Sequence, residues 1–441
     1  MIDFIAQISF DRACKEKKIH LVHNPKTVET SCLINSYQDE AAKIKYSVLD
    51  NRAFIKKTSD KKFLALAFIY GEDRQKLRHI LKVSDADVRT DPELLLELYL
   101  KFGEDSLKTM SNGFIFVLVD YRKKTVRAFR DHIGIKNICY YHSDNSVYLS
   151  SSFKNLFKLK HLPHTPNQDK LNKFLMLDDK SPSDTFTNEI KRVPPMNALK
   201  FYQNKINIYK YSSYEINSNY TSYPSQIKGL KKLLFNSVAI DSSSNYSRIG
   251  FLFSGGIDSS TIISFFRKQK RTNEEIYSFS AQYKQIDNNI KHLIDESEYQ
   301  NEILRLDDVK EFSFNGEDES TLSNLDFYLE IIGQPFFFPN LYLSNMAFNL
   351  AHENNVDIVM NGNDGDSIVS HGYEYLLELF FSLRWIKLYK MINANSKVRR
   401  QSKKFIFNET VLKKLSFQNL LSSSSKKKHI EAVMSNSHNK A

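Results

Sequence analysis

Short apolar runs separated by polar turns fill the first half of the chain, and they predict a layer of strands. Residues 63–70 and 114–120 are continuous apolar runs of the length typical of buried strands. Residues 125–129 follow the second run across a short polar turn, as expected for a β-hairpin, and residues 147–150 continue the pattern.

One helix is predicted among these strands, over Pro92–Phe102. Asp91 is a suitable N-cap, proline is favoured in the first helical turn, and Gly103 is a typical stop. The first half is therefore predicted to be a mixed layer of short strands with a helix.

From about Ser225 the pattern changes to helices that alternate with strands. Such alternation predicts a parallel sheet covered on both faces, with a ligand site at the carboxyl ends of its strands. Ser254, Ala281 and Asn361 each follow or end one of these strands. The predicted helices are 226–238 and 342–354, and the predicted strands are 249–253, 276–281 and 356–360.

A stretch rich in Ser, Asn and Tyr, residues 209–224, lacks periodicity and predicts a domain boundary. We expect a first domain over residues 1–220 and a second over 221–385. Residues 386–441 are expected to form a basic tail that is helical or disordered.

The composition is that of a soluble globular protein, with 41% hydrophobic and 26% charged residues in 441. No apolar run reaches the roughly 20 residues that span a bilayer, and no secretory signal precedes the first strand. The three cysteines, Cys14, Cys32 and Cys139, are too far apart to indicate a disulfide framework or a zinc site. A cytoplasmic protein without a membrane partner is expected.

The net charge of +11 is concentrated in the last part of the chain. Residues 383–441 contain 14 Lys and Arg but only Glu409 and Glu431 as acids, which gives +12. This tail is interpreted either as a solvated charged segment or as a surface for an anionic ligand or nucleic acid.

The turn after the strand of residues 249–253 carries the most specific chemistry. It reads Ser254-Gly255-Gly256-Ile257-Asp258-Ser259-Ser260 and is followed by a helical pattern. The glycines allow positive φ and close approach of a ligand, and N–H groups at a helix N-terminus suit phosphate oxygens. The carboxylate of Asp258 suits the Mg²⁺ that accompanies a nucleotide.

This turn lacks the Gly-x4-Gly-Lys-Ser/Thr pattern of kinases and GTPases. It resembles the Ser-Gly-Gly-x-Asp-Ser pyrophosphate loop of enzymes that split ATP into AMP and pyrophosphate. An ordinary turn between a strand and a helix is the alternative.

Taken together, residues 60–380 resemble the asparagine synthetase family, which includes β-lactam synthetase and lasso-peptide cyclases. Arg130–Lys136 is similar to the family's Arg-Asp-x-x-Gly-x-Lys/Arg turn, Val193-Pro194-Pro195 to its Leu-Pro-Pro segment, and Asn361–Asp366 to its Ser-Gly-Glu-Gly-x-Asp loop. The resemblance implies an Ntn-hydrolase-like α+β sandwich followed by an α/β pyrophosphate-loop domain of the adenine nucleotide α-hydrolase-like type.

The resemblance also implies roles for individual residues. Asp258 and Asp366 would hold Mg²⁺ against the pyrophosphate of ATP and count as the catalytic residues. Without the first motif, a surface turn would be the better interpretation of residues 361–366. The nucleotide would be bound by Leu252, Ser254, Gly255, Gly256, Asp258, Ser259, the backbone at Ala281, Asn361 and Gly362.

Three departures from the family pattern bear on activity. Glutamine-hydrolysing members carry an N-terminal cysteine, whereas here Met1 is followed by Ile2 and the first cysteine is Cys14. The first domain is therefore expected to be a degenerate glutaminase scaffold. Asn363 replaces a glutamate of the family loop. The family's late lysine has no identifiable counterpart, and truncation of the C-terminus stays open.

The leading hypothesis is an ATP-dependent, AMP-forming carbon–nitrogen ligase that adenylates a carboxylate for attack by an amine or ammonia. Its partners would be ATP and the carboxylate of an amino acid or a peptide. If the substrate is a peptide, a precursor peptide or a leader-binding partner is possible; nucleic acid is not expected. A peptide macrolactam cyclase of the same family is one alternative. The other is a non-catalytic nucleotide-binding relative that acts through its basic tail.

Overall fold

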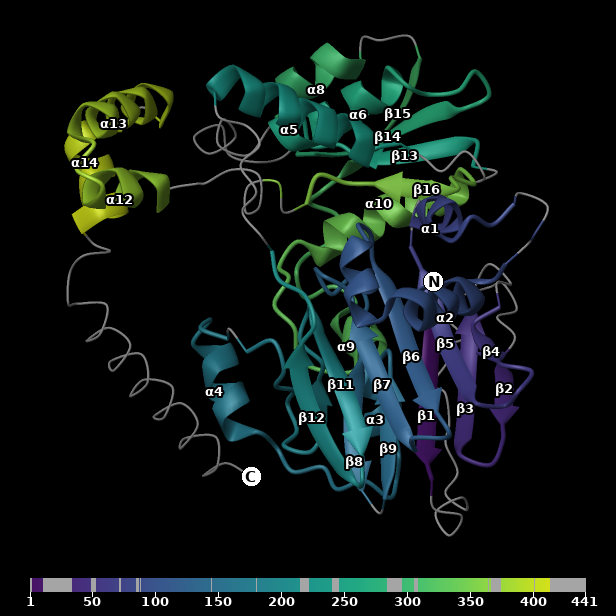
Figure 1. The fold of residues 1–441 in the computed structure, drawn as a ribbon. Coiled ribbons are helices and arrows are strands. Elements are labelled where there is room, and N and C mark those ends of the chain that lie inside the picture. Colours follow the sequence, from purple (N-terminus) through teal and green to yellow (C-terminus); the bar gives the residue numbers. More distant parts are fainter. Residues whose placement is uncertain are drawn as a thin grey trace.

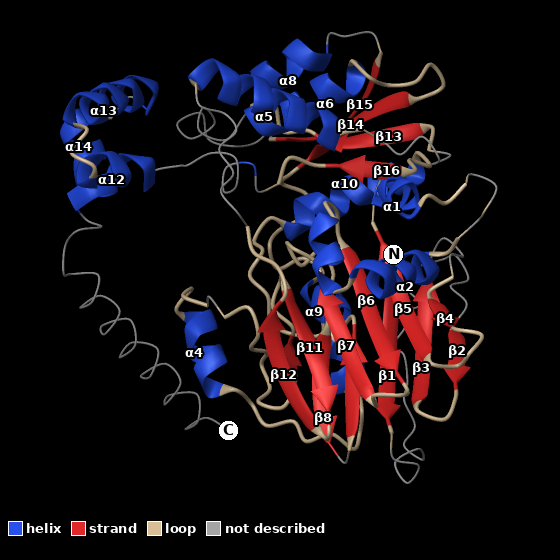
Figure 2. Ribbon diagram, viewed as in Figure 1, coloured by secondary structure: helices blue, strands red, loops and turns tan. Residues whose placement is uncertain are grey.

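The computed structural model describes residues 2–10, 34–48, 53–70, 73–84, 87, 89–143, 145–179, 181–214, 222–239, 246–283, 296–304, 308–363, 365, 374–399 and 401–412. Figures 1 and 2 show two layers of antiparallel strands in one half and a parallel sheet with helices in the other.

Two six-stranded antiparallel sheets pack against each other in the described part of the first half. One has the order β10-β8-β9-β1-β3-β2 and the other β12-β11-β7-β6-β5-β4. The first sheet contains β1 (Ile2–Ser9), β2 (Asn35–Gln38), β3 (Ala42–Val48), β8 (Cys139–Ser143), β9 (Ser146–Ser150) and β10 (Lys191–Arg192). The second contains β4 (Ile55–Lys57), β5 (Phe63–Ile69), β6 (Phe114–Asp120), β7 (Thr125–Arg130), β11 (Asn197–Tyr202) and β12 (Lys205–Lys210).

Apolar side chains from the two sheets form the central core, for example Phe4 and Ile44 from one sheet with Leu66 and Val117 from the other. Helices cover the outer faces, so β5 and β6 are buried on both sides. This double burial explains why their sequences are continuous apolar runs rather than alternating ones. The covering elements are α1 (Asp73–Leu81), α2 (Asp91–Phe102), η2 (Glu104–Thr109) and α3 (Phe153–Phe157), and α4 (Gln168–Leu175) lies further along the chain.

Helix α2 confirms the predicted helix, but its N-cap is Thr90 and not Asp91. Glu93 Oε2 accepts from both the N–H and the hydroxyl of Thr90, at 2.9 and 2.8 Å. Asp91 instead is buried, accepts from Ile69 N at 2.9 Å and pairs with Arg74. The sequence prediction was wrong by one residue because Asp91 has a long-range partner.

The second half contains a four-stranded parallel sheet with the order β15-β14-β13-β16 among the described strands. Its strands are β13 (Arg248–Leu252), β14 (Glu275–Gln282), β15 (Val309–Asn315) and β16 (Ile358–Met360). Helices pack on both faces, which confirms the predicted α/β class. They are α5 (Tyr223–Ser237), α6 (Ile257–Arg267), α8 (Ser297–Leu304) and α10 (Leu341–Glu353), whereas α9 (Leu325–Ile332) lies beside α3 of the first half, with Glu330 3.9 Å from Lys154.

The last described helices pack on one another around Leu376, Leu388 and Ile406. They are α12 (Glu374–Phe381), α13 (Trp385–Arg399), α14 (Lys403–Phe407) and the π-helical turn η3 (Asn408–Leu412), and Figure 1 shows them to one side of both halves. None of the helices in the described ranges is both long and apolar enough for a bilayer. The domain limits at 220 and 385 stay predictions.

Candidate functional site

A pocket of about 770 Å³ lies at the carboxyl ends of β13, β14 and β16, where a parallel sheet is expected to bind its ligand. Seven of the predicted site residues line it: Leu252, Ser254, Gly256, Asp258, Ser259, Ala281 and Gly362. Gly255 and Asn361 are next to lining residues but are not part of the wall. Asp366 lies outside the described residues.

In the turn between β13 and α6, one of the two glycines adopts the positive φ that the sequence predicts. Gly255 has φ 89°, in the left-handed region, whereas Gly256 has φ −66° and serves as the N-cap of α6. A Cβ on Gly255 would lie 3.0 Å from both Gln300 Cγ and Glu296 O. The position therefore requires glycine for its conformation and for its close neighbours.

Hydroxyl groups hold this turn in place. Gly256 N donates to Ser254 Oγ at 3.1 Å, Ser259 Oγ donates to Gly256 O at 3.2 Å, and Ser260 Oγ donates to Gly255 O at 3.3 Å. The first N–H groups of α6 have no carbonyl partner within the helix and lie at its positive end. The turn can therefore offer N–H donors to phosphate oxygens without rearrangement.

The second predicted loop packs directly on the first. A Cβ on Gly362 would lie 2.9 Å from Ser259 N, and one on Gly365 would overlap the carboxylate of Asp258. Gly362 and Gly365 therefore come this close to Asp258 only because these two positions lack side chains. The structure thus brings Gly362 and Gly365 of the second motif against Asp258 and Ser259 of the first.

This arrangement fits the nucleotide and metal that the sequence implies. The space that a side chain at Gly365 would fill is directly beside the Asp258 carboxylate, and hard oxygen ligands are what Mg²⁺ prefers. Within the described ranges no group of three or more metal-ligating side chains occurs. A two-carboxylate site with Asp366 therefore stays a prediction.

Several pocket residues were missed by sequence analysis. Gln300, from α8, donates from Nε2 to Ser254 O at 3.0 Å and so holds the first residue of the turn in place. Tyr283 follows the end of β14, and burial raises the pKa of its phenol, which keeps the hydroxyl neutral. The position of Tyr283 follows from the strand-end rule, but nothing near Gln300 in the sequence indicates its contact. Phe338, Asn340, Leu343 and Ser344 complete a wall on the α10 side.

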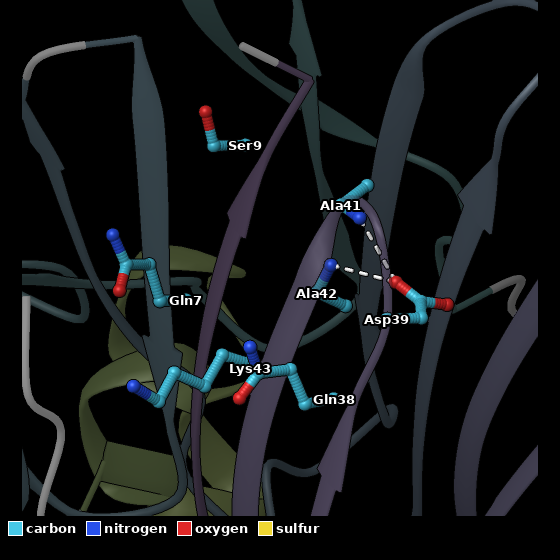
Figure 3. A pocket seen from close by; sticks show the side chains of 7 residues that line it. All are labelled: Gln7, Ser9, Gln38, Asp39, Ala41, Ala42 and Lys43. Carbon is cyan, nitrogen blue, oxygen red and sulfur yellow. Dashed lines mark hydrogen bonds between the residues drawn. The ribbon is translucent and has the colours of Figure 1, made fainter. Parts of the chain in front are cut away.

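The first half contains a second, much smaller space of about 10 Å³ between β1, β2 and β3 (Figure 3). Asp39 Oδ1 accepts from Ala41 N and Ala42 N at 2.9 Å, and Oδ2 accepts from Lys57 Nζ at 2.8 Å and from two tyrosine hydroxyls. Burial would raise the pKa of Asp39, but these donors outweigh it and lower the pKa to about 2. The Asp39 carboxylate accepts hydrogen bonds at both oxygens, and these bonds hold the loop between β2 and β3 in place.

Cys139, on β8, is the cysteine that the described part of the chain contains, and it is fully buried. Burial raises the pKa of its thiol to about 11, although Arg192 and Arg130 lie close enough to oppose the shift. A thiol of this kind stays protonated at neutral pH and is no nucleophile. Cys14 and Cys32 lie outside the described residues.

Two family models match the chain, a glutamine amidotransferase domain over residues 62–212 and asparagine synthase over residues 229–440. The chain is 26% identical over 293 residues to a Methanocaldococcus jannaschii protein assigned as asparagine synthetase [glutamine-hydrolyzing] 2, which covers 64% of this chain and 54% of that protein. It is 25% identical over 201 residues to Bacillus subtilis asparagine synthetase [glutamine-hydrolyzing] 3, an alignment that covers 45% of this chain and 33% of that protein.

The chain therefore spans about half the length, or less, of these relatives. Among solved structures, an allosteric regulatory enzyme of purine biosynthesis aligns over 81% of this chain and 83% of its own length. The sequence identity is 9% and the TM-score is 0.31, a likeness too distant to support an inference.

Proposed function

Because the chain belongs to the asparagine synthetase family, we propose that it forms an amide bond at the expense of ATP, which it splits into AMP and pyrophosphate. The observation that carries this proposal is the contact of Gly362 and Gly365 with the Ser254–Ser260 turn at Asp258. It joins a phosphate-binding turn and a carboxylate in one pocket large enough for a nucleotide.

In the proposed reaction, an oxygen of the substrate carboxylate attacks the α-phosphorus of ATP and pyrophosphate leaves. An amine or ammonia then attacks the acyl carbon, and AMP leaves with the bonding electrons. The N–H groups of the turn and the N-terminus of α6 would stabilise the charge on the departing pyrophosphate. Asp258, with Asp366 as the expected second ligand, would hold Mg²⁺, which supplies further neutralisation of that charge.

We further propose that glutaminase activity has been lost. Cys139 cannot serve as the nucleophile because its thiol is buried and its pKa is raised to about 11. Ammonia or an amine carried by the substrate would then be the nitrogen donor. Glutamate release from glutamine by the purified protein, above the level of a Cys14→Ser variant, would contradict this.

The alternative of a non-catalytic nucleotide-binding relative is favoured by one observation. Asn363 lines the pocket and offers an amide where the family loop has a carboxylate. This alternative predicts ATP binding without turnover. A macrolactam cyclase predicts turnover only with a peptide that carries both the carboxylate and the amine.

The test is pyrophosphate release from ATP, measured with panels of amino acids and peptides in the presence of ammonia. We expect release that requires a carboxylate and is abolished by EDTA, and a loss of at least about 100-fold in Asp258→Asn, of the size seen when electrostatic stabilisation is removed. Glu353→Gln, an exposed carboxylate on α10 outside the pocket, is the matched control. Full activity in Asp258→Asn would refute the site, and ATP binding without release for any substrate would favour the non-catalytic alternative.

A further inference from the structure

Another pocket, of about 460 Å³, lies where the two halves of the molecule meet. One side comes from α4, the segment after it and β10, and the other from residues 334–337. The same segment continues into Phe338 and Asn340, which line the nucleotide pocket. The two pockets therefore share one short stretch of chain as a wall.

The walls of this interdomain pocket are mainly aromatic. Phe174 and Phe186 meet edge to face with centroids 5.3 Å apart, and Pro335, Phe336 and Phe337 face them from the other half. Lys170 is almost fully buried, but it is neutralised by Asp179 and lies 5.8 Å from the Phe186 ring. A concave apolar surface with few polar groups is typical of a small-molecule site.

Among the described residues, no carboxylate pairs with the positive charge of Arg192 in this pocket. Arg192 donates from Nη2 to Gln334 Oε1 at 2.8 Å and from Nη1 to Asp184 O at 3.2 Å, and both acceptors are neutral. Its Nε is buried without an oxygen or nitrogen acceptor among the described residues, and the Cys139 thiol is the group that lies near the guanidinium. A carboxylate would compensate this charge, and guanidinium groups recognise carboxylates with well-defined geometry.

Leu177, at the mouth of the pocket, adopts an unfavourable backbone conformation. Leu177 N donates to Phe174 O at 3.0 Å and Asp178 N to Lys173 O at 2.9 Å, the Schellman pattern that ends a helix. Its φ is 54°, where glycine or asparagine is usual, yet the position holds a leucine whose surface is 67% exposed. Backbone strain that displays an exposed apolar side chain beside a pocket points to a binding role.

We propose that this pocket binds a carboxylate with an aromatic or large aliphatic body, such as an amino acid or the end of a peptide. The carboxylate pairs with Arg192, and the apolar body packs between Phe186 and Phe337 under Leu177. The inference goes beyond the proposed function and does not depend on it, because binding here needs neither ATP nor turnover.

Binding is measured by calorimetry with the full chain in the absence of nucleotide, using three probes. We expect N-acetylphenylalanine to bind at least tenfold more tightly than N-acetylphenylalanine amide, which lacks the charge, or than acetate, which lacks the apolar body. Arg192→Gln should remove the preference for the acid over the amide. Asp258→Asn should leave binding of all three probes unchanged, which separates this pocket from the nucleotide site.

Leu177→Gly is the decisive variant, because a variant that folds poorly would lose both stability and affinity, whereas this one should lose affinity alone. We expect the melting temperature to rise as the strain is relieved, while affinity for N-acetylphenylalanine falls several-fold. Lys82→Gly is the matched control: Lys82 has φ 55° and ends α1 with the same two hydrogen bonds, but it lines neither this pocket nor the nucleotide pocket. It should raise stability and leave affinity unchanged. Equal binding of the acid and the amide, no binding of any probe, or full affinity in Leu177→Gly would each overturn the proposal.

Discussion

At the scale of single residues, the two loops can contact each other because glycine, which has no side chain, occupies positions 362 and 365. Gly365 leaves room for the Asp258 carboxylate, and Gly362 leaves room for the backbone at Ser259. A methyl group at either position would have to displace Asp258 or the start of α6, because the neighbouring atoms are backbone or carboxylate atoms.

We therefore predict that Gly365→Ala lowers affinity for ATP at least about tenfold, which corresponds to about 1.4 kcal/mol. The Cβ would push the Asp258 carboxylate out of position, while the parallel sheet stays folded. Affinity is measured by titration with a non-hydrolysable ATP analogue. Gly103→Ala is the contrasting control: at φ 75° it should lose about 1 kcal/mol of stability without any loss of nucleotide affinity. Unchanged affinity in Gly365→Ala would show that the two loops do not cooperate in binding.

Residues of the candidate site differ in how far the sequence could reveal them. The Ser254–Ser260 turn was predictable because its glycines, its acid and its strand-to-helix context are all local. Gln300 was not, because its bond to Ser254 O joins positions 46 apart and no spacing rule connects them. The roles of Asp258 and Asp366 as metal ligands remain predictions at this scale.

At the scale of elements, burial on both faces made β5 and β6 easy to predict from their apolar runs. Strands β2 and β4 were not identified, because they are short and largely exposed and their sequences carry no alternation. The start of α2 shows a third case: Asp91 has the right residue type for a cap, but Arg74 and Ile69 N take up its carboxylate.

The start of α2 gives a prediction that separates the role of Thr90 from that of Asp91. Thr90→Ala should lower the free energy of unfolding by about 1 kcal/mol, because the reciprocal contact with Glu93 is lost. Asp91→Ala should cost more, because it leaves Arg74 and Ile69 N without their partner in a buried setting. Urea unfolding of both variants is the measurement. A larger loss in Thr90→Ala than in Asp91→Ala would contradict the structural role given to the contacts of Asp91 with Arg74 and Ile69.

At the scale of the whole molecule, the arrangement of the halves could not be foreseen from the sequence. The pocket between them joins Arg192 to Gln334, positions 142 apart, and no local pattern links α4 to the segment before α10. Short apolar runs predicted the strands of the first half, and alternating helices and strands predicted the second half. Contacts between the halves depend on the tertiary packing of surfaces that look like ordinary loops in the sequence.

The basic tail, residues 383–441, offers the last test, at this same scale. In its described part, Arg384, Lys387 and Lys390 are exposed and line a pocket of about 450 Å³ together with Trp385 and Ile386. A net charge of +12 over the tail should bind polyanions and release their counterions, so affinity should fall steeply as salt rises. Replacing the three cations by glutamine should weaken heparin binding and make its salt dependence shallower.

The same triple variant should bind ATP as tightly as the unchanged chain, because the phosphate-binding groups belong to the Ser254–Ser260 turn and Asp258. Heparin affinity over a range of salt concentrations, ATP affinity and pyrophosphate release are measured on one preparation. If the tail instead supplies a lysine to the reaction, pyrophosphate release falls while heparin binding hardly changes. That result would contradict the proposal of an electrostatic surface and would indicate that a residue of the tail takes part in the reaction.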